Sequence, residues 1–348
     1  MGMAAKQRNA GLDVLRLLSM LMVCVLHVNF RLQITEIFPN FLCETVCIQA
    51  VDLFAMLTGY LCIGTSWKVQ RYLSLWFQVA FYSVGFLAVG CVLKYMGVFP
   101  AFEPNYGKAL LPVPLAGEYW YFTAYTAVFL LAPFLNRLMA GFTRKETRAL
   151  LLIVVPVFSL MTLLRGTDVV YGDGYNAAWL ISLYVLGAYL KMYPLKWTKL
   201  AASVTLACSL AFSALLYHAR ILDEEVWGYS FPLVVLSSVC IFHLCVGMTI
   251  KSRGIVRVTT YLSPLAFGVY LVHCHQFPWF VLQKVLGYMH YYTGHTWWFV
   301  PLFGLGLFLV CIGVDWCRAQ LFRLLGVSRW AERLAAACPA WLRDLEKM

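Results

Sequence analysis

Arg16 and His27 lie within one long apolar stretch near the N-terminus. Because they are eleven residues apart, about 1100° of helical rotation separates them, roughly 20° more than three full turns. They therefore share one helix face and lie about 16.5 Å apart along the axis. Ionisable groups inside such a span are costly unless they pair or line a cavity, so the spacing predicts a polar tunnel. A snorkelling Arg16 paired with Asp13, or a His27 bonded to a neighbouring helix, would explain the same pattern.

The next apolar stretch carries Asp52 and Thr58, and two cations follow it. Asp52 is expected to face protein, because a carboxylate at that depth is unfavourable against lipid. Thr58 precedes a glycine, so close helix packing is the simplest explanation for this small residue. Lys68 and Arg71 are one turn apart at the predicted inner boundary, where ordinary positive-inside charge would account for them. Beside Arg16 they would instead form an anion site for phosphates.

A third polar group, Tyr270, His273 and His275, lies late in the chain. The span that carries it runs in the same direction as the first, so His273 should reach a depth similar to that of His27. His-x-His also occurs in metal sites, but a rotation of about 200° puts the two rings on opposite sides of a helix. No carboxylate or cysteine pair stands beside them at ligand spacing. We therefore predict no metal site.

Glu118, Trp120 and Tyr121 open the fourth predicted span, after the longest connecting loop. Trp and Tyr are common where a helix meets the membrane surface, so an interfacial belt is one explanation for the two rings. Carbohydrates also stack on such rings, so a sugar-binding rim is the alternative.

The composition indicates what kind of protein positions these residues. Of the 348 residues, 62% are hydrophobic, 16% aromatic and 12% charged, and the mean hydropathy is +0.75. Soluble domains average about 45–50% apolar and 25% charged residues. Continuous runs of about 20 apolar residues exclude a membrane β-barrel, and the composition excludes a soluble enzyme, a secreted disulfide scaffold and a disordered chain. We predict an all-α polytopic membrane bundle.

The sequence predicts about ten transmembrane helices, with both termini in the cytoplasm. Most of the 27 Lys and Arg residues then fall on the inner side, and Arg31 is one of the few outside. This topology explains the net charge of +11 without nucleic-acid binding. Residues 1–317 would form the membrane domain, and residues 318–348 a basic amphipathic tail on the inner-leaflet lipids. The predicted spans are 12–30, 45–66, 72–95, 118–136, 148–165, 175–192, 198–217, 229–250, 258–283 and 296–317.

Five segments together resemble the acyltransferase-3 family of bacterial integral membrane acyltransferases. They are Arg16-x10-His27, the stretch 51–61 with its Asp and Thr-Gly-Tyr, Trp120-Tyr121-Phe122, Tyr184-Val185-Leu186-Gly187-Ala188-Tyr189, and Phe267-Gly268-Val269-Tyr270-Leu271-Val272-His273. Their order and spacing cover almost the whole chain. Two positions depart from the family pattern. Thr58 replaces the usual Ser, and Lys68-x-x-Arg71 stands where Arg-x-x-Arg is common, which loses one bidentate phosphate contact.

The resemblance implies a bacterial cell-membrane enzyme that takes an acyl group, most often acetyl, from cytoplasmic acyl-coenzyme A. The acceptor would be a hydroxyl of an extracytoplasmic glycan or lipid-linked sugar. His27 would be the general base, with its ring oriented by Asp52, and Tyr270 or His273 would stabilise the oxyanion or bind the acceptor. The coenzyme phosphates would bind Arg16, Lys68 and Arg71, and the acceptor would contact Thr58, Glu118, Trp120 and Tyr121.

Two other functions remain open at this level. A bundle around a polar tunnel would also suit a transporter that exports a polysaccharide, sugar or amino acid. A proton-coupled carrier would use His27 and Asp52 as a relay. The sequence does not decide whether the chain forms a homo-oligomer.

Overall fold

The computed structural model describes residues 8–32, 38–110, 118–163, 174–293 and 298–347, and these residues are helical with connecting turns and no strand. The all-α prediction is confirmed for this part of the chain. The helices are α1 Ala10–Leu32, α2 Phe38–Cys47, α3 Ala50–Cys62, α4 Val69–Tyr95, α5 Tyr106–Leu110, α6 Trp120–Gly141, α7 Arg144–Leu163, α8 Ala177–Met192, α9 Lys199–His218, η1 Glu224–Trp227, α10 Pro232–Val246, α11 Arg253–Leu262, η2 Ser263–Leu265, α12 Ala266–Cys274, α13 Gln276–Thr293, α14 Phe299–Leu325, α15 Val327–Ala337, α16 Ala340–Asp344 and η3 Leu345–Lys347.

Eight helical segments of the described residues are long and apolar enough to cross a membrane. The protein is therefore a polytopic helical membrane protein. The two other predicted spans, 148–165 and 175–192, correspond to α7, which begins with charged residues, and to α8, which has only 16 residues. Residues 164–165 and 296–297, at the ends of two predicted spans, lie outside the described residues. The eight segments are Ala10–Leu32, Asn40–Cys62, Val69–Tyr95, Trp120–Gly141, Lys199–His218, Glu224–Val246, Arg253–Cys274 and Phe299–Leu325.

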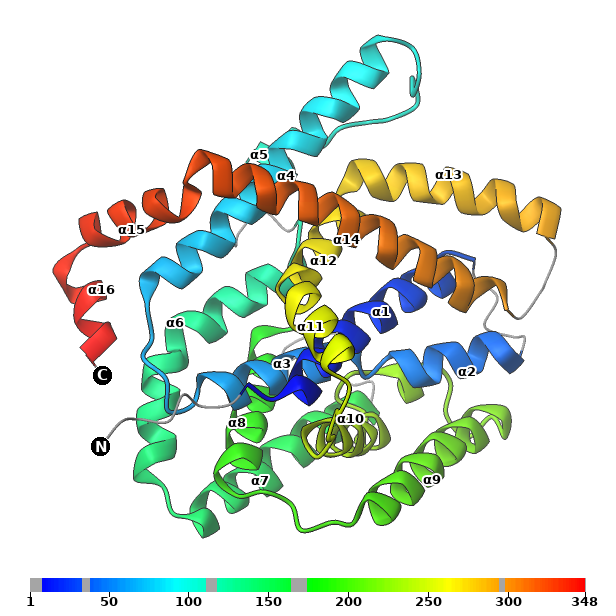
Figure 1. Cartoon of the computed structure of the whole chain (residues 1–348). Coiled ribbons are helices and arrows are strands. Elements are labelled where there is room, and N and C mark those ends of the chain that lie inside the picture. The colour runs from blue at the N-terminus through cyan, green and yellow to red at the C-terminus, as the bar shows by residue number, and fades with distance from the viewer. Residues whose placement is uncertain (1–7, 33–37, 111–117, 164–173, 294–297, 348) are drawn as a thin grey trace.

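Helix α1 lies at the centre of the bundle. It packs against α2, α3 and every element from α10 to α14, and Figure 1 shows it between α14 and α10. More than half of its length is buried, including Asp13 and Asn29. On the stripe that carries Arg16 and His27, the intervening Met20 and Val23 are buried, while Arg16 and His27 are partly buried.

Helices α3 and α8 cross in backbone contact because each has a glycine at the crossing. A Cβ on Gly59 would lie 1.9 Å from the Tyr184 carbonyl oxygen, and a Cβ on Gly187 would lie 1.9 Å from the Met56 carbonyl oxygen. The absence of both side chains brings the helices to van der Waals contact of their main chains. This crossing fixes the position of α3, which lines both pockets described below.

The predicted span 258–283 is broken into α11, η2, α12 and α13. Pro264 lies in the first turn of η2. The backbone N–H that proline lacks would have no partner within the helix at this position, so the residue is tolerated. The second break is at His275, whose backbone is extended at φ −67° and ψ 143°. This turn separates α13 from α12 and brings the end of α12 to α1.

A buried carboxylate joins α4, α12 and α14. Asp315 is fully buried and accepts hydrogen bonds from Gln78 and Tyr82 of α4 and two from Arg318. Gly268 of α12 leaves room for it, since a Cβ there would lie 1.9 Å from the carboxyl carbon. Helix α14 itself continues past residue 317 without a break, to Leu325. The amphipathic helix α15 follows Gly326 and packs against α4.

Candidate active site

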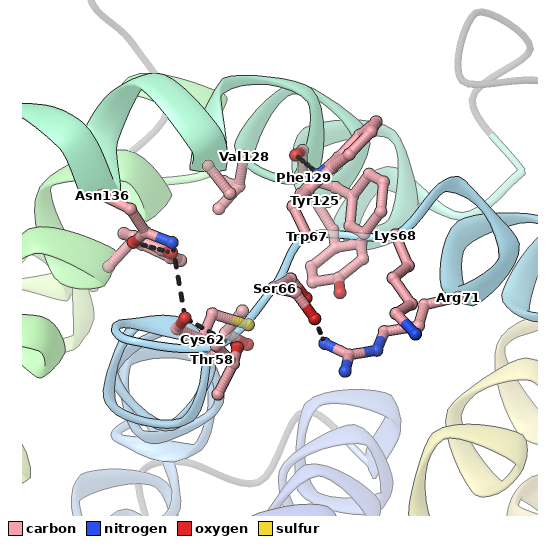
Figure 2. Close-up of a pocket in the computed structure, with 13 residues that line it drawn as sticks. Thr58, Cys62, Ser66, Trp67, Lys68, Arg71, Tyr125, Val128, Phe129 and Asn136 are labelled. Carbon is pink, nitrogen blue, oxygen red and sulfur yellow. Dashed lines mark hydrogen bonds between the residues drawn. The ribbon is translucent and has the colours of Figure 1, made fainter. Parts of the chain in front are cut away.

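The first pocket, called here the cationic pocket, has a cavity volume of about 70 Å³ and lies between α3, the start of α4, and α6. Thr58, Lys68 and Arg71, all predicted site residues, line it. Figure 2 shows Lys68 and Arg71 together on one side of this pocket, away from Asn136. Both cations are exposed, and Arg71 donates to the carbonyl oxygen of Ser66 at 3.0 Å. The pocket therefore combines a positively charged rim with a mostly apolar wall.

A tryptophan holds the rim of the cationic pocket against α6. Trp67 is buried and its Nε1 donates to the carbonyl oxygen of Phe129 at 2.7 Å (Figure 2). Its ring lies 5.0 Å from the Phe129 ring, centroid to centroid. Because Lys68 follows directly, this anchor fixes the backbone that carries the cation.

The second pocket, called here the histidine pocket, has a cavity volume of about 40 Å³. Four predicted site residues from three helices line it, namely His27, Trp120, Tyr121 and Tyr270. Tyr270 is 7% exposed, and its hydroxyl accepts from the backbone N–H of Tyr121 at 3.3 Å. The pocket wall is otherwise apolar or aromatic, so the imidazole is its principal basic group.

The two pockets adjoin along α3 and α6. Phe54 lines the histidine pocket, and Thr58, one turn later on α3, lines the cationic pocket. On α6, Tyr121 lines the histidine pocket, and Tyr125, one turn later, lines the cationic pocket. Their rings are stacked at 6.5 Å between centroids. One helical turn is about 5.4 Å, so the two cavities are neighbours on one wall.

Arg16 lies beside the cationic pocket without lining it. Its Nη1 donates to Ser263 Oγ at 3.4 Å, and its charge acts on Tyr125 and Cys62, which do line that pocket. Asp13 forms its ion pair with Arg8, at 2.7 Å, rather than with Arg16. Hydrogen bonding to Asp13 raises the pKa of Arg8 above its ordinary value. Arg16 is therefore left without a direct acidic partner among the described residues.

The hydrogen bonds around His27 define its tautomer. His273 Nδ1 lies 2.6 Å from the Val269 carbonyl oxygen, which can only accept, so Nδ1 carries the proton. In a neutral ring, His273 Nε2 is then an acceptor, and it lies 2.9 Å from His27 Nδ1. His27 Nδ1 must donate to it, which leaves the lone pair of a neutral His27 on Nε2.

Two further side chains, Cys274 and Trp279, adjoin His27. Cys274 Sγ lies 3.6 Å from His27 Nδ1, and the Trp279 ring meets the imidazole edge-on at 5.3 Å between centroids. The donor atoms of His27, His273 and Cys274 all lie within 4.8 Å of one another, a group able to hold a metal ion. The sequence analysis identified neither neighbour. The only available signal for Cys274 was its position directly after His273.

His275 points away from His273 as predicted, but the cause is the end of α12 at Cys274 and the extended His275 backbone, not helical rotation. Its Nε2 donates to the Ser83 carbonyl oxygen at 3.0 Å, and its Nδ1 accepts from the backbone N–H of Phe277 at 3.1 Å. The two rings of the His-x-His motif thus do not converge on one point.

Asp52 and Glu118 lie outside both pockets and have other partners. Asp52 is fully buried, and its Oδ1 accepts from Trp179 Nε1 at 3.1 Å. The partner of His27 Nδ1 is His273 and not Asp52. Glu118 accepts from both the backbone N–H of Gln276, at 2.7 Å, and its side-chain Nε2, at 3.2 Å. It thereby satisfies a free N–H in the first turn of α13. Each of these carboxylates is therefore hydrogen-bonded to protein and does not line either pocket.

These features define a helical membrane protein with a hydrogen-bonded histidine pair at an aromatic pocket that adjoins a cationic one. A family model described as an acyltransferase domain matches residues 9–316, and the chain belongs to this acyltransferase-3 family. The predicted family resemblance is confirmed. No curated protein and no solved structure matches the chain.

Proposed function

We propose that this protein is a membrane O-acyltransferase that moves an acyl group, most often acetyl, from acyl-coenzyme A to a hydroxyl of an extracytoplasmic or lipid-linked glycan. The observation that carries the proposal is the pair of adjoining pockets. One has a cationic rim suited to a polyanionic donor, and the other contains the imidazole suited to activate an acceptor.

The donor would enter through the cationic pocket. Lys68 and Arg71 at the rim, with Arg16 beside it, would bind the coenzyme phosphates by charge-assisted hydrogen bonds. The apolar wall formed by α3 and α6 suits the thin pantetheine arm. The separation of about 16.5 Å between Arg16 and His27 along α1 is of the order of that arm's length.

Acyl transfer would take place at His27. Its Nε2 takes the proton of the acceptor hydroxyl as the hydroxyl oxygen attacks the thioester carbonyl. The C–S bond then breaks, and the departing coenzyme A thiolate receives that proton from the imidazolium. The Tyr270 hydroxyl, whose proton is not used in its contact with the Tyr121 N–H, would donate to the oxyanion. His273, through its bond to His27 Nδ1, would supply the orienting function that the sequence suggested for Asp52.

The acceptor would bind in the histidine pocket against Trp120 and Tyr121. Trp120 belongs to a cluster of rings, stacked on Tyr229 at 6.1 Å and tilted against Tyr175 at 4.8 Å between centroids. Tyr229 lines the same pocket. Such a surface offers the stacking faces that sugars use.

The test is to supply labelled acetyl-coenzyme A to inside-out membrane vesicles and to count label in glycan and lipid extracts. Vesicles would contain the wild type, His27→Gln, or the matched control His243→Gln on α10. A general base contributes about 10²–10⁴-fold, so His27→Gln should lose at least about 100-fold in transfer while the control keeps it.

Full transfer by His27→Gln would rule out the general-base role. If wild-type vesicles transfer no label from acetyl-coenzyme A or from longer thioesters, the enzyme proposal fails. Net flux of an unmodified sugar or amino acid, without coenzyme A release, would then establish a transporter.

A further inference from the structure

Arg31 extends the polar stripe of α1 beyond His27. His27 and Arg31 are four positions apart in the sequence. This spacing is about 400° of rotation, or 40° past one turn, so both side chains lie on the same face of α1. The rise between them is about 6 Å. Arg31 lies on the opposite side of His27 from Arg16, which is the predicted outer side. The stripe therefore carries a cation on each side of the proposed base.

The Arg31 guanidinium is held close to the reacting centre. Its Cζ lies over the Trp279 ring, 4.0 Å from the centroid, and the same ring contacts His27 edge-on at 5.3 Å. Arg31, Trp279 and His27 thus form one continuous set of contacts. A snorkelling arginine would instead extend its head away from the protein toward water.

The guanidinium also has an unused hydrogen-bond donor. Arg31 Nε is buried and has no hydrogen-bond partner, and none of the ion pairs found in the described part of the chain includes Arg31. A buried N–H without a partner costs about 1–3 kcal/mol, so such a group is expected to serve a purpose. The Arg31 side chain as a whole is only partly buried, so a ligand oxyanion can reach the guanidinium and neutralise its charge.

We propose that Arg31 binds an oxyanion of the acceptor, so the acceptor is an anionic glycan that carries a carboxylate or a phosphate near the acylated hydroxyl. This inference rests on the proposed function and adds the chemical class of the acceptor. Guanidinium binds either oxyanion through two parallel N–H donors. The rise of about 6 Å places the anion on the same sugar as the accepting hydroxyl, or on the next unit.

The experiment compares Arg31→Gln, Arg31→Lys and the control Arg220→Gln in the labelled vesicle assay. Arg220 is an exposed arginine in the turn after α9, away from both pockets. The labelled product is applied to an anion exchanger. Retention that is lost after carboxyl reduction identifies an acidic sugar, and retention that is lost after mild acid release of a lipid diphosphate identifies a lipid-linked phosphate.

We expect the wild-type product to be retained and Arg31→Gln to raise the apparent KM for acceptor about 10- to 100-fold, as for loss of a charged hydrogen bond. Arg31→Lys should restore part of the loss, and Arg220→Gln should behave as the wild type. Binding of labelled acetyl-coenzyme A by each purified variant shows that it is folded and should not change.

A neutral labelled product, or equal transfer by Arg31→Gln and Arg220→Gln, would overturn this inference and leave the acyltransferase proposal standing. Absence of transfer by the wild type would refute both this inference and the acyltransferase proposal.

Discussion

The bond between His27 and His273 gives the sharpest test of how the imidazole is oriented. In His273→Leu, the His27 Nδ1–H loses its acceptor at 2.9 Å and keeps only the weaker Cys274 sulfur at 3.6 Å. Loss of a good acceptor at such a site costs about 1–3 kcal/mol, and the ring also loses the partner that fixes its tautomer. Since each 1.36 kcal/mol is tenfold in rate, kcat should fall about 10- to 100-fold. His273→Gln retains an acceptor oxygen and should recover much of this loss.

The assay is steady-state transfer of labelled acetyl groups, with kcat and KM for acetyl-coenzyme A measured separately. KM should stay constant, because α3, α4 and α6 form the cationic pocket and His273 lies on α12. Metal content is measured on the same samples. Equal kcat for the Leu variant and the wild type would refute the orientation argument. Stoichiometric zinc, with activity lost to a chelator, would also refute it, because His27 Nδ1 and His273 Nε2 cannot share a proton while both bind a metal.

Two other substitutions test the elements that support the site. Gly59→Ala places a methyl group 1.9 Å from a backbone oxygen of α8, so it should destabilise the protein by about 1–3 kcal/mol or more. The control Gly85→Ala has no neighbour within 4 Å, and thermal unfolding in detergent compares the two; equal melting temperatures would contradict the tight crossing. Arg71→Gln should raise KM for acetyl-coenzyme A about 10-fold with little change in kcat, as expected for a charged hydrogen bond to phosphate. Arg148→Gln, an exposed inner-side control on α7, should leave KM unchanged, and an equal effect of both would count against a phosphate site at the rim.

The arrangement within single helices could be predicted from the sequence. Rotation per residue placed His27 on one stripe with Arg16, because both lie on the continuous helix α1, whose geometry is nearly the same in every protein. The rings of His273 and His275 also diverge as predicted, but for another reason: α12 ends at Cys274 and the His275 backbone is extended. The apolar runs likewise located the helices, because bilayer thickness sets their length.

Partners across helices could not be predicted. Asp52 and His27 lie on different helices. Nothing in their spacing indicates that the Asp52 carboxylate is hydrogen-bonded to Trp179 on α8, or that the His27 imidazole is hydrogen-bonded to His273. The tight crossing of α3 and α8 decides this, and it depends on which two glycines meet. Glu118 shows the same limit, since its bonds to Gln276 arise only because the chain turns at His275.

The central position of α1 explains why its sequence carries so much of the proposed chemistry. A helix in contact with α2, α3 and the elements from α10 to α14 can present one stripe to several neighbours at different depths. Arg16 meets Ser263 of η2, His27 meets His273 of α12, and Arg31 meets Trp279 of α13. A donor that enters beside Arg16 and an acceptor held by Arg31 would then approach the same imidazole from opposite ends. On the proposed mechanism, the two substrates would then react without either crossing the membrane.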